Sequence, residues 1–582
     1  MEGTGMLDYL IKGGTIVDGT GAPGVTGDVG VRDGRVTALG RVEEPAAETI
    51  DADGLVVAPG FVDPHTHYDA QLFWDPYATP SNVHGVTTVI SGNCGFTLAP
   101  LKERDADYIR RMMTKVEGMP LAALEEGVDW SWESFAGYLA ALEGRIAVNA
   151  GFMVGHCALR RYVMGADATG GEATGDQLAE MTRLLHECIA AGGMGLSTTL
   201  SHTHSDGDGR PVASRYASRE ELVALSRATG EHEGTTLEGA FEGCLDTFSD
   251  DEIDLLTAMS VAARRPLNWN VLTIDSRAPE KARRQLEASA RAADAGGRVV
   301  ALTMPVPVPM NMSLRTFCAL NLIPGWGEVL GLPIDRRVSA LRDPAVRKRL
   351  LERAHGPEAG VFRRLADFGK YVVGDTYSAA NEGLKGRVVE EVAAERGLDP
   401  FATLIEIAAA DDLRTVLWPM PPDNDAASWR LRQVIWEHEH VMLGGSDAGA
   451  HLDRMCGAPY TTRFLGDALR GRRLVPLERA VRMITMDPAR LFGLRGRGVL
   501  APGRHADIVL FDPATVGAED AALVHDLPGG GPRLTAGSTG VVRVLVGGVE
   551  TVRDGTATGA TPGAVLRSGR DTSTVATPGA PR

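Results

Sequence analysis

The chain has 582 residues, of which 44% are hydrophobic and 23% are charged, and its formal net charge is −17 at pH 7. These proportions are those of an ordinary soluble globular protein. The length exceeds what one small core accommodates and favours a large barrel-type domain with appendages. The acidic balance argues against nucleic acid or an anionic membrane as the main partner, because both attract basic surfaces.

The sequence contains no targeting or membrane signal that we can identify. Residues 1–6 lack the basic and apolar regions of a secretory signal, and no apolar run is long enough to span a membrane. The six cysteines, which show no Cys-X-X-Cys spacing, are Cys94, Cys157, Cys188, Cys244, Cys318 and Cys456. In so long a chain this pattern indicates reduced thiols, and we expect a cytoplasmic protein.

Both ends of the chain carry short strand signals. Residues 1–60 and 493–572 contain alternating apolar segments, and the pairs Asp33-Gly34 and Gly547-Gly548 predict tight hairpin turns between them. Neither end is large enough to be stable alone, so we expect the two to form one small β-sandwich. Residues 573–582 are predicted to be a disordered tail.

The middle of the chain, residues 61–492, alternates apolar runs with helical patterns, which is typical of parallel βα units. The prediction is an α/β fold, a (β/α)8 TIM-like barrel, with its chemistry at the carboxyl ends of the strands. Besides the strand before His65, the candidates are residues 86–91, 147–155, 193–199, 235–239, 267–273, 298–304, 371–374 and 441–445, one strand too many.

The alternation of strands and helices fails at about residues 305–370. This segment opens with three prolines between Met304 and Met310, and each proline removes a backbone donor. We expect an insertion here, and it is either a lid or substrate wall over the barrel mouth or a plain surface excursion.

His65 and His67 end the apolar run that begins at Val56. Alternation along an extended chain sends both imidazoles to the same side, where two of them can hold one divalent ion. The alternative is a pair of surface or capping histidines in a loop.

Two further residues stand at predicted strand ends. Asp447 follows the glycine-rich end of the last strand and can point into the mouth, where it can act as a metal ligand and accept a proton from a bound water. The alternative for Asp447 is a helix N-cap. Cys94 lies just past the second strand and, as a thiolate, is a soft zinc ligand, although many cysteines are simply buried apolar residues.

Taken together, these motifs resemble the amidohydrolase superfamily, and within it the N-acyl-D-amino-acid deacylase (D-aminoacylase-like) branch. The resemblance rests on His65-Thr66-His67, Gly92-Asn93-Cys94-Gly95 and Gly445-Ser446-Asp447, with a supporting segment at Glu117-Gly118-Met119-Pro120. It implies a metal-dependent barrel with a β-sandwich from both termini and one or two divalent metal ions, Zn2+ first. It also implies Cys94 in place of the carbamylated lysine of hydantoinase relatives.

The chain departs from this family pattern at two strands. Family members carry one His at the end of the fifth strand and another at the sixth, but residues 235–239 and 266–271 contain none. The candidates to replace them as metal or substrate contacts are Glu238, Asn270, His202 and His204. His156, at the end of the third strand, either orients substrate or makes a structural hydrogen bond.

The expected substrate-binding residue is an arginine, because its guanidinium fork suits a carboxylate. In relatives this arginine follows the catalytic Asp, and the candidates here are Arg215, Arg454 and Arg463.

The sequence therefore predicts a metal-dependent hydrolase of a small-molecule substrate with an amide or other non-peptide C–N bond, with Asp447 as general base and then general acid. N-acyl-D-amino-acid deacylation is the family-level expectation. The alternatives are a cyclic-amide hydrolase, a deaminase or a non-hydrolytic enzyme that uses the same site, and a degenerate barrel that only binds a ligand. The oligomeric state, including a homo-oligomer, is left open.

Overall fold

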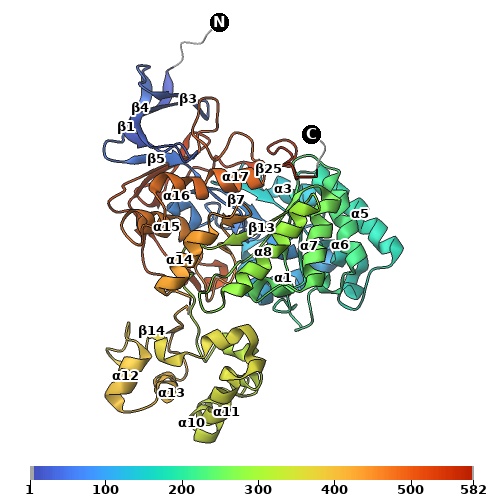
Figure 1. The fold of residues 1–582 in the computed structure, drawn as a ribbon, viewed down its shortest axis with the longest axis vertical. Helices are drawn as coiled ribbons and strands as arrows, with labels where there is room; N and C mark the ends of the chain where they lie inside the picture. Colours follow the sequence, from blue (N-terminus) through green and yellow to red (C-terminus); the bar gives the residue numbers. More distant parts are fainter. Residues whose placement is uncertain (1–5, 317, 422, 580–582) are drawn as a thin grey trace.

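The computed structural model describes residues 6–316, 318–421 and 423–579. Three parts lie along the long axis of the molecule: a sheet built from N-terminal and C-terminal strands, a central α/β body, and a smaller helical part below it (Figure 1). No helix in the described ranges has the length and apolar character needed to cross a membrane. The six cysteines are all buried free thiols.

The two ends of the chain share one nine-stranded sheet, in the order β24-β23-β22-β17-β5-β1-β2-β3, with β4 paired to β1. Antiparallel pairing of β5 with β17 joins the N-terminal and C-terminal strands. The strands are β1 Leu7–Ile16, β2 Val25–Arg32, β3 Arg35–Gly40, β4 Ala46–Asp51, β5 Val56–Pro59, β17 Ile508–Phe511, β22 Val541–Val546, β23 Val549–Arg553 and β24 Thr556–Ala557.

The two hairpins predicted in this sheet are confirmed. Asp33 and Gly34 both have positive φ between β2 and β3, and Gly547 and Gly548 both have positive φ between β22 and β23. This is the conformation of a type I′ turn, whose twist matches that of the paired strands.

The middle of the chain forms two parallel sheets, β25-β8-β7-β6 and β16-β13-β12-β11-β10-β9. A single residue, Met153, separates β8 from β9, and Thr66 forms an isolated parallel bridge with Ala448, so the two sheets adjoin at two places. Over the described residues they are not one closed sheet. The strands are β6 Phe61–Asp63, β7 Val86–Ser91, β8 Asn149–Phe152, β9 Val154–Gly155, β10 Gly195–Thr199, β11 Thr236–Ala240, β12 Pro266–Trp269, β13 Arg298–Thr303, β16 Val441–Leu443 and β25 Val565–Leu566.

Helices α4 to α8 connect these strands and cover one side of the central body (Figure 1). Capping boxes begin two of them, with Thr174 and Gln177 at α5 and Ser249 and Glu252 at α7. The helices of the central body are α1 Ala106–Glu117, α2 Leu121–Gly127, α3 Phe135–Leu142, α4 His156–Met164, α5 Gly175–Ala190, α6 Arg219–Gly230, α7 Asp250–Ala263, α8 Pro279–Asp294, α14 Ala426–Ile435, α15 Tyr460–Leu469, α16 Leu477–Met483 and α17 Met486–Leu491.

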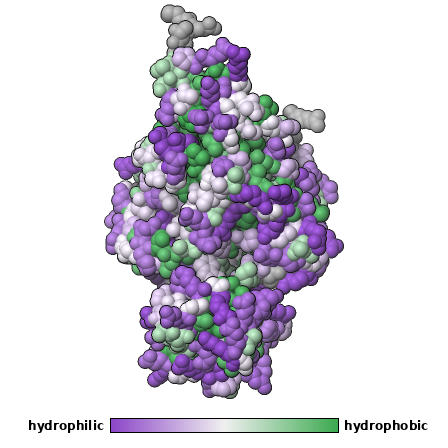
Figure 2. Space-filling view, turned by 90° about the vertical axis from the view of Figure 1, so that its left-hand side faces the viewer, coloured by the Kyte–Doolittle hydropathy of each residue, from purple (hydrophilic) through white to green (hydrophobic). Residues whose placement is uncertain are grey.

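The break in alternation predicted at about residues 305–370 marks a separate helical part, which we call the excursion and which contains residues 312–417. It has its own apolar core between Met312 and Leu417, so it is longer than predicted. Its elements are α9 Trp326–Leu330, α10 Ile334–Arg342, α11 Pro344–His355, α12 Val389–Arg396, α13 Pro400–Ala410, β14 Val372–Val373 and β15 Leu417–Trp418. A narrower neck separates the excursion from the rest, and hydrophilic residues cover most of its visible face (Figure 2).

One predicted strand of the parallel set is wrong. Residues 371–374 contain β14, which pairs antiparallel with β15 inside the excursion. The sequence pattern offered one strand too many because two apolar residues in this small hairpin have the same local signature as a buried parallel strand.

The C-terminal segment after β24 crosses to the central body. β25 pairs parallel with β8, and Ser573 N–H donates to the carbonyl of Gly493 at 2.9 Å. Gly579 N–H donates to the carbonyl of Gly296 at 2.8 Å. Residues 573–579 therefore differ from the predicted disordered tail, because their backbone groups pair with the body. The rest of that prediction, residues 580–582, lies outside the described ranges.

Candidate metal centre

His65 and His67 follow β6 in a segment that is fixed on both sides. Thr66 N–H donates to the carbonyl of Ile90 at 2.9 Å, and His67 N–H donates to the carbonyl of Ala448 at 2.7 Å. Thr66 faces away from the two rings, and its hydroxyl also binds Ile90. The two imidazoles therefore lie on the same side, as predicted, with ring centroids 5.3 Å apart.

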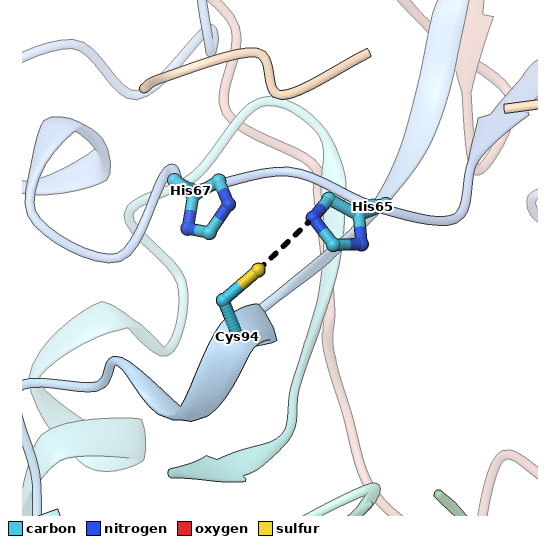
Figure 3. A group of neighbouring side chains, drawn as sticks. All are labelled: His65, His67 and Cys94. Carbon is cyan, nitrogen blue, oxygen red and sulfur yellow. Dashed lines mark hydrogen bonds between the residues drawn. The ribbon is translucent and has the colours of Figure 1, made fainter. Parts of the chain in front are cut away.

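Cys94 lies in the turn after β7 and points between the two imidazoles (Figure 3). Its Sγ is 3.7 Å from Nε2 of His65. Its backbone has a positive φ of 54°, and Cys94 N–H donates to Oε2 of Glu238 at 2.7 Å. Burial, and next the charge of Glu238, raise the pKa of the Cys94 thiol well above its usual value. A bound cation would reverse this shift, because metals stabilise the thiolate.

Asp447 is distant from these residues in the sequence, but its side chain lies beside the two imidazoles. Its Oδ1 is 3.1 Å from Nε2 of His65 and 3.6 Å from Nε2 of His67. Its side chain is 23% exposed, whereas those of the two histidines are buried, so Asp447 lies at the solvent side of the group. Burial favours a raised pKa for Asp447, but the hydrogen bonds and charges of the two imidazoles outweigh it and hold the pKa well below its usual range.

Asn270 supports Asp447 from the end of β12. Its Nδ2 donates to Oδ1 of Asp447 at 3.2 Å. This contact depends on Gly445, which has a φ of +82°, and whose hypothetical Cβ would lie 2.2 Å from Oδ1 of Asn270. The glycine-rich strand end thus lets the amide approach, as the sequence suggested.

The group has the donor set of a zinc site. One nitrogen from each histidine and the sulfur of Cys94 all lie within 4.8 Å of one another. Imidazole nitrogen and thiolate sulfur are the ligands that zinc prefers. The residues present therefore fit a bound divalent ion.

Buried carboxyl groups surround this group, and their electrostatics favour a cation. Burial is the largest cause that raises the pKa of Asp63 to about 7, of Asp69 to about 6, of Glu117 to about 7 and of Glu238 to about 8. Burial lowers the pKa of His67, but Glu117 and Asp447 together raise it to about 9. A bound divalent ion would supply positive charge beside these buried carboxyl groups and would favour their ionised forms.

Sequence reasoning gave no role to Asp63, Asp69 or Glu117, and the last of these contacts the ring of His67. It ends α1, and its Oε1 is 3.2 Å from Nδ1 of His67. Gly118 follows with a φ of +63°, and a Cβ there would lie 2.5 Å from Oδ1 of Asp453, so the turn needs glycine. The only sequence signal was the segment Glu117 to Pro120, which supported the family resemblance without assigning a role to its carboxylate.

The other predicted histidines divide between the site and its surroundings. Burial, and next the charge of His67, lower the pKa of His204 to about 4. Its Nδ1 contacts Oγ1 of Thr199 at 2.8 Å. His156 is buried elsewhere, between Thr198 and Glu221, and His202 is exposed beside Glu242. Among the described contacts, neither His156 nor His202 reaches the metal-facing atoms.

The three predicted arginines occupy different places. Arg454 is partly buried, with Nη1 2.8 Å from Asp453 and Nη2 2.7 Å from Nδ1 of His451. Its hydrogen-bonded neighbour His451 also donates its N–H to the carbonyl of Glu117, which places Arg454 beside the metal-facing group. Arg215 binds the carbonyl of His204 at 3.1 Å, and Arg463 binds the carbonyl of Glu519.

Comparison with known proteins decides the family. Residues 48–555 match the family model described as the amidohydrolase family. The chain belongs to the amidohydrolase family. As members of that family act on non-peptide C–N bonds, it is a hydrolase of that class.

Three similar proteins place this amidohydrolase among the deacylases. It is 32% identical to the D-aminoacylase of Alcaligenes xylosoxydans xylosoxydans over 96% of this chain and 97% of the relative. It is also 32% identical to the N-acyl-D-aspartate deacylase of the same organism, over 97% and 95%. A solved N-acyl-D-glutamate deacylase from Bordetella bronchiseptica, complexed with zinc and a phosphonate inhibitor, matches with a TM-score of 0.63 and 26% identity, covering 97% of this chain and 100% of that one.

Proposed function

We propose that this amidohydrolase removes the acyl group from an N-acyl-D-amino acid, using one or two zinc ions held at the carboxyl ends of a (β/α)8 barrel. The barrel would comprise β6, β7, the joined pair β8 and β9, and then β10 to β13 and β16. Two observations support this barrel. The strands are parallel and follow chain order, and the two sheets that they form adjoin at Met153 and at the Thr66–Ala448 bridge. The six buried free thiols support a cytoplasmic location.

One observation carries the proposal: four side chains from three distant segments converge. Nε2 of His65 is 3.7 Å from Sγ of Cys94 and 3.1 Å from Oδ1 of Asp447. Nothing in the fold alone requires two imidazoles, a thiol and a carboxylate to share one buried point. A common ion satisfies all of them at once.

The ion would be held by His65, His67 and Cys94, with Asp447 at its solvent side. A zinc ion bound there polarises a carbonyl group and lowers the pKa of water, which makes hydrolysis feasible at neutral pH. Glu238 and Asn270, predicted to replace the absent strand histidines, lie around these ligands. Glu238 binds the backbone of Cys94, and Asn270 binds the side chain of Asp447.

Asp447 would carry the proton. Its low pKa keeps it ionised and able to accept a proton from the attacking water. After the amide carbon becomes tetrahedral, the same carboxyl group returns the proton to the departing nitrogen. Asn270 holds the carboxylate through Oδ1 and leaves Oδ2 for this transfer. Because the side chain reaches solvent, substrate and water can approach it.

Arg454 is the residue that we propose for the substrate carboxylate. It lies beside His451 and near the backbone of Glu117, the residue whose side chain contacts His67. Asn311, the residue just before the excursion, also contacts Arg454. Its N–H donates to the carbonyl of Arg454 at 2.8 Å. An arginine near the metal-facing group suits an acylated amino acid, whose carboxylate and amide are close together.

The test is a substrate panel with zinc-loaded protein. N-acetyl-D-amino acids, their L enantiomers, and a cyclic amide such as a hydantoin would be assayed side by side, with and without chelator. The proposal predicts chelator-sensitive turnover of the D substrates above both other classes. Turnover of the cyclic amide alone would support ring-opening hydrolysis instead. Well under one tightly held zinc per chain, without turnover, would support a ligand-binding barrel.

A further inference from the structure

We propose that two buried glutamates, Glu117 and Glu238, orient the metal-facing histidines from behind and are positioning residues of the metal centre. The inference rests on the proposed function, because it requires an ion on the Nε2 side of His65 and His67. It concerns residues of this chain that lie outside the four proposed ligands.

The first contact joins His67 to Glu117. Nε2 of His67 faces Asp447, so Nδ1 lies on the opposite side of the ring, 3.2 Å from Oε1 of Glu117. Both side chains are 3% exposed. A histidine that binds a metal through Nε2 carries its proton on Nδ1, and a carboxylate at that position fixes the orientation of the ring.

The second contact joins Glu238 to two ligands at once. Oε1 of Glu238 is 3.7 Å from Nδ1 of His65, which is longer than a hydrogen bond, and both side chains are fully buried. Neither of these two atoms has a hydrogen-bond partner among the described residues. Oε2 of the same glutamate accepts the N–H of Cys94 at 2.7 Å. Glu238 thereby contacts the turn that presents the thiol and the ring beside it.

The two glutamates reach the centre from separate elements, which makes their shared arrangement informative. Glu117 is the last residue of α1, and Glu238 lies within β11. Burying a carboxylate is costly unless a partner compensates it. For Glu117 this partner is the ring of His67, and for Glu238 it is the N–H of Cys94, with the ring of His65 farther away.

A third buried pair provides the matched control. Glu221 contacts Nε2 of His156 at 2.7 Å and also binds Arg160. It too is a buried glutamate beside a buried histidine, and this histidine contacts none of the proposed ligands. Glu221→Gln therefore also removes a buried carboxylate beside a buried histidine, but it does so away from the metal centre.

Zinc affinity measures the proposed role without any substrate. Metal-free protein would be titrated with zinc against a chromophoric chelator for the unaltered chain, Glu117→Gln, Glu238→Gln and Glu221→Gln. Glutamine keeps the volume but loses the charge that holds Nδ1–H. We expect roughly 10- to 100-fold weaker zinc binding for the first two variants, the usual effect of removing such a partner, and unchanged binding for Glu221→Gln.

The cobalt-loaded proteins give a second readout that a merely structural role would not move. We expect Glu238→Gln to shift the thiolate-to-cobalt absorption, since it alters the Cys94 turn. Glu117→Gln should keep that absorption and change the weaker ligand-field bands. If a glutamine variant does not fold, Glu117→Asp or Glu238→Asp would replace it. The shorter side chain keeps the negative charge but moves it away from the histidine, so this variant should also bind zinc more weakly.

The outcomes separate this inference from the proposed function. If folded Glu117→Gln and Glu238→Gln bind zinc as tightly as the unaltered chain, with the same cobalt spectra, the positioning role is wrong even where D substrates are still hydrolysed. If the unaltered chain holds no zinc, both proposals fail together.

Discussion

The chemistry of Asp447 is set by its immediate neighbours. Burial raises the pKa of this carboxyl group, but the hydrogen bonds and charges of two imidazoles within 3.6 Å outweigh that effect. The residue that we propose as the proton acceptor is therefore held ionised by the same histidines that we assign to the ion.

Asp447→Asn tests this role at the scale of one atom. The amide has nearly the same shape but cannot take a proton, so we expect turnover of the best D substrate to fall by roughly 10²- to 10⁴-fold. His65, His67 and Cys94 remain, so zinc should stay bound. The measurements are kcat and zinc content on the same preparation. Turnover within a few-fold of the unaltered chain would remove Asp447 from the proton-transfer step.

Several site residues could be found from the sequence because each is tied to a strand end. His65, His67, Cys94 and Asp447 all follow apolar runs, and the carboxyl ends of parallel strands meet at one edge. Glu117 gave no such signal, since it ends a helix and nothing local relates it to His67. His156 also follows a strand end, but its ring contacts Glu221 and not the proposed ligands. Its place in the sequence does not indicate this orientation.

At the scale of elements, the turn after β16 is shaped by glycine. Gly445 has positive φ and lies against Asn270, whose amide holds Asp447. The position of the Asp447 carboxylate therefore depends on the backbone of this turn through the amide of Asn270.

Gly445→Ala should reduce activity through this contact. A Cβ there would lie 2.2 Å from Oδ1 of Asn270 and displace the amide, and a shift of about 1 Å near the reacting group can cost about 100-fold in rate. Gly503→Ala is the control, because Gly503 has nearly the same φ, +84°, but nothing within 4 Å of the hypothetical Cβ. Both should lose about 1 kcal/mol of stability from backbone strain. Equal kcat in the two variants would contradict the argument.

The C-terminal segment is a second element whose role lies in its contacts. Thr572 is buried, donates its hydroxyl to the carbonyl of Gly234 at 2.7 Å, and accepts the N–H of Gly569 at 3.1 Å. These bonds attach residues that follow the terminal sheet to the central body.

Thr572→Val should lower the free energy of unfolding by about 1–3 kcal/mol, because it leaves a buried carbonyl and a partly buried N–H unpaired. Thr561→Val, at an exposed position earlier in the same segment, should change it by less than about 0.5 kcal/mol. Urea denaturation measures both values. A Thr572→Val variant as stable as the Thr561→Val variant would mean that this segment contributes little to the fold.

At the scale of the whole molecule, the order of the parallel strands could be predicted because buried strands and amphipathic helices have different periods. The extent of the excursion could not, since its helices have the same pattern as those of the body. Its separate core between Met312 and Leu417 depends on which apolar faces meet, and spacing along the chain does not specify this.

Acid stability is another property of the whole fold, and His84 is one of the buried histidines that contribute to it. Its ring is fully buried, with Nδ1 2.7 Å from Oγ1 of Thr462 and Nε2 3.0 Å from the carbonyl of Ala536. Burial is the main cause that lowers its pKa to about 4. The unfolded chain, with an ordinary value near 6.5, therefore binds this proton first as the pH falls.

The stability that His84 contributes should be complete above about pH 6.5 and lost as the pH falls to about 4. The pKa difference corresponds to about 3 kcal/mol. His84→Gln removes the titrating group, so its unfolding free energy should fall less steeply over this range. Urea denaturation at a series of pH values measures the difference. Parallel pH dependences for the two proteins would show that His84 is not buried in its neutral form.

The most direct test of the whole account is X-ray absorption at the zinc edge of the loaded protein. The account predicts one sulfur at about 2.3 Å together with nitrogen or oxygen ligands at about 2.0–2.1 Å, and loss of the sulfur signal in Cys94→Ser. A spectrum without sulfur, or one that Cys94→Ser leaves unchanged, would contradict the convergence of His65, His67, Cys94 and Asp447 on one ion.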